Sequence, residues 1–150
     1  MNENYINLIS KDMNNYLSNL NVLYTKLHNY HWNVVGEGFF TLHVKLEELY
    51  NAVSDEIDVI AERIIMIGGK PLGSLREYLS NSTLKESSSN DIKSKELVES
   101  LLSDFKLLLD ESKKIHLLTN SNDDPVTSSI IENSISNYEK NIWMLSSYLK

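Results

Sequence analysis

Three of the four histidines in this 150-residue chain fall between residues 28 and 43, and two of them flank one glycine-rich segment. His31 and His43 lie at equal distances from Glu37, the centre of a Gly-Glu-Gly sequence. If that segment joins two antiparallel helices, equidistant residues lie at the same height and the two imidazoles approach each other. Imidazole is the commonest neutral metal ligand, so the pair indicates a metal site. The alternative is that each histidine is a hydrogen-bonded structural residue.

Three acidic residues downstream of His43 share its helix face. With about 100° per residue, Glu47, Asp58 and Glu62 are rotated from that histidine by about 40°, 60° and 100°. Asp58 and Glu62 are also four residues apart, so their like charges destabilise the helix unless a cation lies nearby. The alternative interpretation is a solvated acidic face, with Arg63 neutralising part of the charge.

The histidines and the distal carboxylates cannot meet within one chain, because residues 43 and 58 are separated by roughly 22 Å along one helix. A two-fold axis near residue 50 would lay a second copy of this helix antiparallel, so that His43 of one copy faces Asp58 of the other. Two imidazoles with carboxylates suit ferrous iron and its oxidation, although zinc and manganese accept the same ligands. The predicted ligands are His31, His43 and Glu47 of one copy and Asp58 and Glu62 of the other.

Apolar residues recur at helical spacing along most of the chain and predict four long helices. The residues expected on the buried faces are Ile9, Met13, Tyr16, Leu20, Leu23 and Leu27 in the first helix, Leu42, Leu46, Leu49, Val53, Ile57, Ala61 and Ile64 in the second, and Leu97, Leu101, Phe105, Leu108 and Ile115 in the third. Gly36 and Gly38 end the first helix, and the segment GGKPLG ends the second, because glycine and proline interrupt helices. Residues 68–93 form a long polar connection with a short helix at LREYLS. The long helices are placed at about Tyr5–Val34, Phe39–Ile67, Lys93–Leu118 and, after a cap at Asp124 and Pro125, up to Leu149.

Connections of short, long and short length predict an all-α, ferritin-like four-helix bundle with a crossover that carries a short helix, in one domain spanning residues 1–150. Ordinary di-iron sites inside such bundles use the motif Glu-x-x-His, which this chain lacks. The metal site is therefore expected between subunits and not inside the bundle.

Composition limits the partners and the location. The absence of cysteine excludes disulfides and thiolate metal sites, and it is compatible with a cytoplasmic protein. The formal net charge is −7 and neither end carries a basic cluster, which argues against binding to the DNA backbone. No secretory signal and no membrane-spanning run is visible, so we expect a cytoplasmic protein without a membrane partner.

With these residues in place, the sequence resembles the Dps family, the mini-ferritins named as DNA-binding proteins from starved cells. The resemblance covers nearly the whole chain and is most specific in NYHWNVVGEGFFTLHVKLEELY, DEIDVIAERIIMIGGKPLG and EKNIWMLSSYL. It implies a ferroxidase that oxidises Fe(II), preferentially with hydrogen peroxide, and deposits ferric mineral inside a hollow homo-dodecamer. It also implies protection against oxidative damage. The family's ferroxidase ligands, which lie between subunits, correspond to His31, His43, Asp58 and Glu62, with Glu47 as a supporting acid.

Two tryptophans and two departures from the family pattern bear on this interpretation. We expect Trp32 to be a core or interface side chain, or alternatively an electron donor that quenches a stray oxidising equivalent, and Trp143 to be packed. Pro125 and Ser129 occupy positions where relatives often carry acids that line an iron-entry pore, so the entry route is not predicted. The lysine-rich tail through which many relatives bind DNA is also missing.

Two other functions stay open from the sequence. The family name suggests a DNA-binding, chromosome-compacting protein without a significant ferroxidase role. A helical interaction or adhesion module with a vestigial metal site is the third possibility. The twelve-subunit assembly rests on the resemblance alone, because the spacing of the ligands requires only a dimer.

Overall fold

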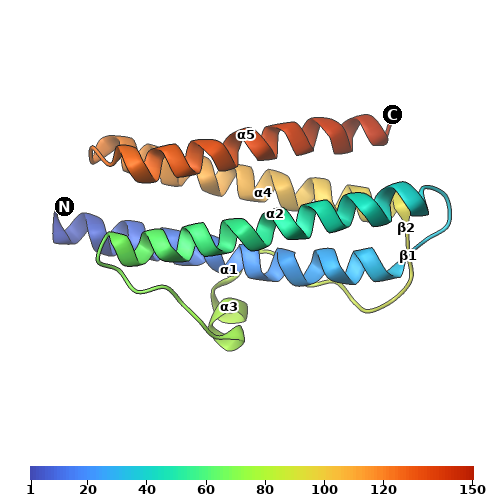
Figure 1. Ribbon diagram of the computed structural model, residues 1–150, viewed down its shortest axis with the longest axis horizontal. Helices are drawn as coiled ribbons and strands as arrows, with labels where there is room; N and C mark the ends of the chain where they lie inside the picture. Colours follow the sequence, from blue (N-terminus) through green and yellow to red (C-terminus); the bar gives the residue numbers. More distant parts are fainter.

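The computed structural model describes residues 1–150, and it consists of five helices and one pair of very short strands (Figure 1). α1 pairs with α2 and α4 pairs with α5 as two antiparallel hairpins, and α1 packs against α4. The crossover between α2 and α4 returns along the bundle beside α1 and carries α3. The helices are α1 (Glu3–Asn33), α2 (Phe39–Met66), α3 (Leu75–Asn81), α4 (Ser94–Ser121) and α5 (Pro125–Tyr148); the strands are β1 (Val34–Val35) and β2 (Ile92–Lys93).

The predicted all-α four-helix bundle is confirmed, and its core follows the predicted periodicity. Every apolar position assigned to the buried faces of α1 and α4 is buried. On α2 the inward positions Ile57 and Ala61 are only half-buried, although they still pack against the core. No helix combines the length and the apolar composition needed to cross a membrane. The buried positions are Ile9, Met13, Tyr16, Leu20, Leu23 and Leu27 on α1, and Leu97, Leu101, Phe105, Leu108 and Ile115 on α4.

Polar side chains of α1 hold the crossover against the bundle. The central one is Asn19, which is completely buried. Its Oδ1 accepts hydrogen bonds from Ser82 Oγ at 2.8 Å and from the backbone N–H groups of Thr83 and Leu84 at 2.8 and 3.0 Å. Lys26 donates to the Lys85 carbonyl at 3.0 Å in the same way. Buried backbone groups need such partners, which explains how a polar connection can lie along a helix.

β1 and β2 tie the α1–α2 turn to the start of α4. They run parallel, with Val34 opposite Ile92 and Val35 opposite Lys93, and they end α1 one residue earlier than predicted. Strands of two residues show no alternation of apolar and polar side chains, so the sequence pattern could not reveal them. Gly38, in the same turn, has a φ of +82°, and a side chain there would collide with the Tyr148 hydroxyl.

A buried ion pair closes the opposite end of the bundle. Asp124 caps α5 as predicted, accepting from the Thr127 N–H at 3.1 Å. The same carboxylate binds the Arg63 guanidinium at 2.9 Å and the Tyr5 hydroxyl at 2.7 Å. Burial raises the pKa of Asp124, but the hydrogen bonds from Thr127 and Tyr5 and the Arg63 charge outweigh burial and hold that pKa below its usual value.

The ion pair corrects the expectation that Arg63 neutralises the acidic face of α2. Arg63 is itself buried and is directed to Asp124 and Thr127. A buried carboxylate requires a charged or hydrogen-bonding partner, and Arg63 supplies it across the bundle. Asp58 and Glu62 are therefore left without this cation.

Candidate metal centre

His31 and His43 lie against each other where α1 ends and α2 begins. Their rings stack with centroids 3.8 Å apart and planes 11° from parallel, as their equal spacing from the turn predicted. His31 Nδ1 donates a hydrogen bond to the His43 carbonyl at 2.7 Å, and His43 Nδ1 donates to the His31 carbonyl at 2.8 Å. The glycine-rich turn thus places each ring against the backbone of the other residue.

The reciprocal hydrogen bonds fix the tautomer of both neutral imidazoles. A carbonyl oxygen can only accept, so the proton of each neutral ring must sit on Nδ1. The lone pair of each Nε2 is then directed away from the backbone and can bind a metal. Hydrogen bonding of the second ring nitrogen to a carbonyl is the usual way in which proteins orient a ligating histidine.

The predicted carboxylates lie on the exposed surface of α2. Asp58 and Glu62 are exposed, and neither forms an ion pair or a side-chain hydrogen bond within the chain. Glu47 is also exposed, and its Oε1 accepts from the Tyr50 hydroxyl at 3.2 Å. No three histidine or acidic side chains come together as a metal site within the chain. The structure therefore brings the two imidazoles together but leaves Asp58 and Glu62 apart from them.

Both tryptophans are exposed in the single chain. Trp143 is 65% exposed, so it is not packed within the single chain. Trp32 is 69% exposed and contacts His28, with ring centroids 5.4 Å apart. Of the two structural interpretations of Trp32, the core one is therefore excluded and the interface one remains.

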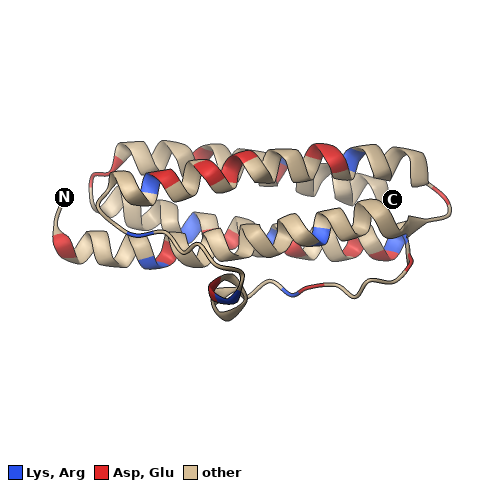
Figure 2. Ribbon diagram, turned by 60° about the horizontal axis from the view of Figure 1, so that its bottom comes forward, with Lys and Arg blue, Asp and Glu red and all other residues tan.

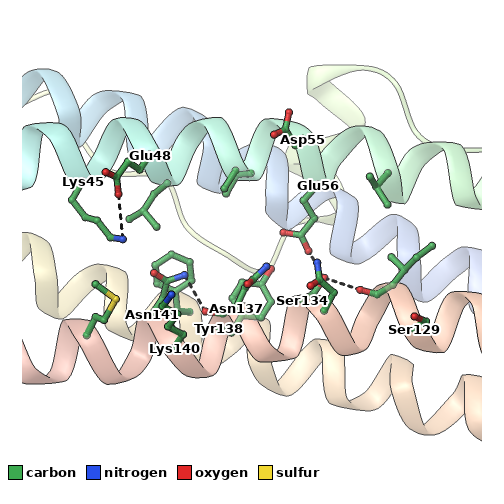
Figure 3. Close-up of a pocket in the computed structure, with 18 residues that line it drawn as sticks. Lys45, Glu48, Asp55, Glu56, Ser129, Ser134, Asn137, Tyr138, Lys140 and Asn141 are labelled. Atoms are coloured by element: carbon green, nitrogen blue, oxygen red, sulfur yellow. Dashed lines mark hydrogen bonds and ion pairs between the residues drawn. The ribbon is translucent and has the colours of Figure 1, made fainter.

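A groove of about 610 Å³ between α2 and α5 contains none of the predicted ligands (Figure 3). Glu56 enters it from α2 and accepts hydrogen bonds from Ser134 Oγ at 2.6 Å and from the Tyr16 hydroxyl, which also contacts Tyr138. Burial raises the pKa of Glu56, and the hydrogen bonds from Ser134 and Tyr16 oppose that shift. The Glu56 carboxylate is thus already engaged by the bundle, and the groove is separate from the histidine pair.

Comparison with known proteins identifies the fold family. The family model of the ferritin-like domain matches residues 10–150. A protein from Bacillus anthracis called DNA protection during starvation protein 2 is 40% identical over 149 residues, which is 99% of each chain. The crystal structure of a Dps protein from Bacillus brevis is 38% identical, covers all of both chains and superposes with a TM-score of 0.95.

The chain belongs to the Dps family of ferritin-like proteins. A Dps protein from Vibrio cholerae O1, described as a member of a broad superfamily of ferritin-like diiron-carboxylate proteins, gives a TM-score of 0.96 at 33% identity. Its alignment covers 100% of this chain and 94% of that one. The ferritin-like superfamily thus associates this fold with iron bound by carboxylates.

Two residues near the histidine pair were missed in the sequence. His28 stacks on Tyr50 at 3.9 Å between centroids, and Tyr50 also meets the His31 ring edge-on at 5.4 Å. Tyr50 is seven residues after His43 and His28 is three before His31, so helical spacing alone would have placed both beside the pair.

The position of Asp124 bears on the iron-entry pore that is not predicted from the sequence. Asp124 directly precedes Pro125, and its carboxylate is buried against Arg63 and Tyr5. Asp124 is therefore unavailable to line a pore, whereas Asp123 beside it is exposed.

Proposed function

We propose that this protein oxidises Fe(II) at centres shared between subunits, preferentially with hydrogen peroxide, and stores the ferric product inside a hollow homo-dodecamer. Iron is then both the substrate and the stored cargo, and its removal with peroxide protects the cell against oxidative damage. The observation that supports this best is the stacked histidine pair, whose hydrogen bonds present two imidazole nitrogens to a metal. Membership of a family of ferritin-like proteins supports the choice of iron.

We assign the ligands to two subunits related by a two-fold axis. His31 and His43 come from one subunit, with Glu47 as a supporting acid, and Asp58 and Glu62 come from its partner. Asp58 and Glu62 are unpaired, exposed and of like charge, which is unfavourable for the isolated helix and becomes favourable beside a cation. Imidazole and carboxylate ligands with open coordination positions suit Fe(II) that must meet an oxidant.

Trp32 has a protective role in this proposal. It follows His31 directly, and its indole contacts His28 beside the candidate centre. Indole is among the most easily oxidised side chains, so Trp32 can supply an electron to an oxidant that escapes the two-electron reaction. The same side chain would also contribute apolar surface to the subunit interface.

Removal of both imidazoles tests the assignment. We expect His31→Ala combined with His43→Ala to reduce peroxide-driven Fe(II) oxidation to the rate seen in buffer, because both nitrogen ligands are lost. The measurement is stopped-flow absorbance of Fe(III) formation. His116→Ala is the matched control, since His116 pairs with Glu132 between α4 and α5, far from the other histidines. A double variant that folds, assembles and still oxidises Fe(II) at the wild-type rate would disprove the site.

DNA binding is the competing function, and the names of relatives such as the Bacillus anthracis protein suggest it. We propose that this chain does not bind duplex DNA at physiological salt, because its net charge is −7. Figure 2 shows its Lys and Arg residues scattered among acidic ones, not gathered on one element. A gel-shift titration in low and physiological salt is the measurement. Tight, salt-sensitive retardation of the duplex would favour the competing function.

A further inference from the structure

The groove of about 610 Å³ between α2 and α5 has no part in the proposed function. It exists because α2 packs against α1 and α5 packs against α4, and we call it the α2–α5 groove. Its polar wall on α5 carries Asn133, Asn137 and Asn141. A concave apolar surface with a few polar groups along it is the usual form of a small-molecule site. The floor is apolar and consists of the buried side chains Leu49, Val53, Phe105 and Tyr138.

Glu56 presents one carboxylate oxygen to the α2–α5 groove (Figure 3). Both hydrogen bonds that its carboxylate receives, from Tyr16 and from Ser134, end on Oε1. Oε2 has no hydrogen bond within the chain and is not enclosed by protein, so it can accept from a molecule in the groove. No lysine or arginine forms an ion pair with Glu56. An ammonium group would supply both the missing donor and the missing positive charge.

Two further carboxylates, Glu48 and Asp55, lie on the α2 rim of the same groove. They are seven residues apart, which places them within about 20° of each other around the helix and roughly 10 Å apart along it. Ala52 lies between them and also lines the groove. Asp55 is exposed, forms no ion pair and directly precedes Glu56. The α2 wall thus presents two anionic positions, separated by apolar surface.

Two lysines in the lining bear on the charge of the ligand. Lys45 pairs with Glu48, with 3.5 Å between its Nζ and the carboxylate Oε2, and both side chains are partly exposed. Such surface pairs contribute little to stability, so an ammonium group can replace Lys45 at this carboxylate. Lys140 of α5 has no ion pair. Three carboxylates against two lysines leave the lining negative, which favours a cationic ligand over an anionic one.

We propose that the α2–α5 groove binds a linear aliphatic polyamine. One ammonium group donates to Glu56 Oε2, the methylene chain lies over Ala52 and the apolar floor, and a second ammonium group reaches Glu48. Polyamines alternate ammonium groups with apolar spacers, as the α2 wall alternates carboxylates with apolar side chains. An inorganic cation would gain nothing from the apolar floor, and a monoamine would leave one anionic position empty. The proposal needs no iron, so it is independent of the proposed function.

Methionine methyl groups can locate the ligand in the assembled, iron-free protein. Spermidine is the probe, and nuclear magnetic resonance of carbon-13-labelled methionine methyls is the measurement. Met144 lines the α2–α5 groove, whereas Met66 is 70% exposed beyond the end of the groove, four residues after Glu62. We expect a saturable shift of the Met144 methyl and none of the Met66 methyl. Equal shifts of both, or a shift of Met66 alone, would make spermidine an unspecific counterion and would overturn the proposal.

A charge-removing variant tests the assigned carboxylate by equilibrium dialysis of spermidine at fixed salt. Glu56→Gln keeps the shape of the side chain, and we expect it to weaken binding about tenfold, because one charge-assisted hydrogen bond is lost. Glu139→Gln is the matched control, since it changes the net charge equally and Glu139 is exposed on α5 outside the groove. It should bind spermidine like wild type. If both variants bind equally, net charge alone explains the affinity and the proposal fails.

A blocking variant keeps the test valid if Glu56→Gln does not fold. Ala52 is exposed on the α2 rim, so Ala52→Phe should fold and assemble. Its ring would cover the apolar surface between Glu48 and Asp55, and spermidine binding should be lost without any change of charge. Undiminished binding by the folded Ala52→Phe variant would overturn the proposal.

Laurate, an aliphatic carboxylate, tests the sign of the ligand charge. We expect it to leave the Met144 methyl unshifted at the concentration at which spermidine saturates, because the lining is negative. A shift with laurate and none with spermidine would assign the groove to an anion held by Lys45 and Lys140, and would refute the proposal.

Discussion

At the scale of residues, the backbone holds each imidazole of the candidate centre. His31 Nδ1 bonds to the carbonyl of residue 43, and His43 Nδ1 bonds to the carbonyl of residue 31. Neither hydrogen bond uses the side chain of the other histidine. The tautomer of each ring is therefore independent of whether its neighbour is present, although the stacking contact is not.

This independence gives a prediction for the single variant. In His43→Ala the carbonyl of residue 43 remains, so His31 should keep its proton on Nδ1 and its Nε2 free. The measurement is the pattern of two-bond nitrogen–proton correlations of the imidazole in nuclear magnetic resonance. Wild type should show the same tautomer for both rings. A proton on Nε2 of His31 in either protein would contradict the assignment.

At the scale of elements, a buried contact joins α1, the crossover and α4. Asn19 Nδ2 donates to Glu111 Oε2 at 2.9 Å, while Glu111 Oε1 is buried without a hydrogen-bond partner. Burial is the main cause that raises the pKa of Glu111 to about 6. The Asp12 carboxylate adds to the rise, and the hydrogen bond from Asn19 and the charge of Lys114 oppose it.

The raised pKa predicts how stability depends on pH. Ionisation of Glu111 is less favourable in the folded chain than in the unfolded chain, where the pKa is close to 4.5. Its contribution to the free energy of unfolding is therefore fully present below that value and is lost as the pH rises through about 6. Glu111→Gln should be more stable than wild type at neutral pH, and its stability should fall less between about pH 5 and 7.

Urea unfolding at a fixed protein concentration measures this effect. Glu139→Gln is the matched control, because Glu139 is exposed on α5 and its replacement should leave the pH dependence of wild type unchanged. A Glu111→Gln variant that is less stable than wild type at neutral pH would mean that the charged carboxylate stabilises the fold. That result would contradict the predicted direction in which ionisation of Glu111 changes stability.

The sequence predicted the elements well where the determinant was local. Helical spacing placed the long helices to within a few residues, and the Asp124 cap was correct because capping depends on neighbouring residues. It did not predict the partner of Arg63, which lies on another element. The ion pair of Arg63 with Asp124 joins distant segments, and no local pattern predicts it.

At the scale of the whole molecule, the predicted ligands of the candidate centre lie near opposite ends of one helix, α2. The histidine pair lies where α2 begins, and Asp58 and Glu62 lie several turns further along the same helix. Backbone rise predicted this separation from the sequence, and the fold keeps α2 as one continuous helix. The exposed Trp32 is one of the apolar side chains that a second subunit would cover.

Complementation between subunits tests the shared centre most directly. One variant combines His31→Ala with His43→Ala, and the other combines Asp58→Asn with Glu62→Gln, so that each alone lacks half of every centre. When equal amounts are unfolded and refolded together, half of the dimers are mixed, and each mixed dimer contains one complete centre and one that keeps only Glu47. Peroxide-driven Fe(II) oxidation by the mixture should therefore recover about a quarter of the activity of wild type refolded in the same way. A mixture that forms mixed dimers, as native mass spectrometry would show, but stays as inactive as its two components would contradict the shared centre.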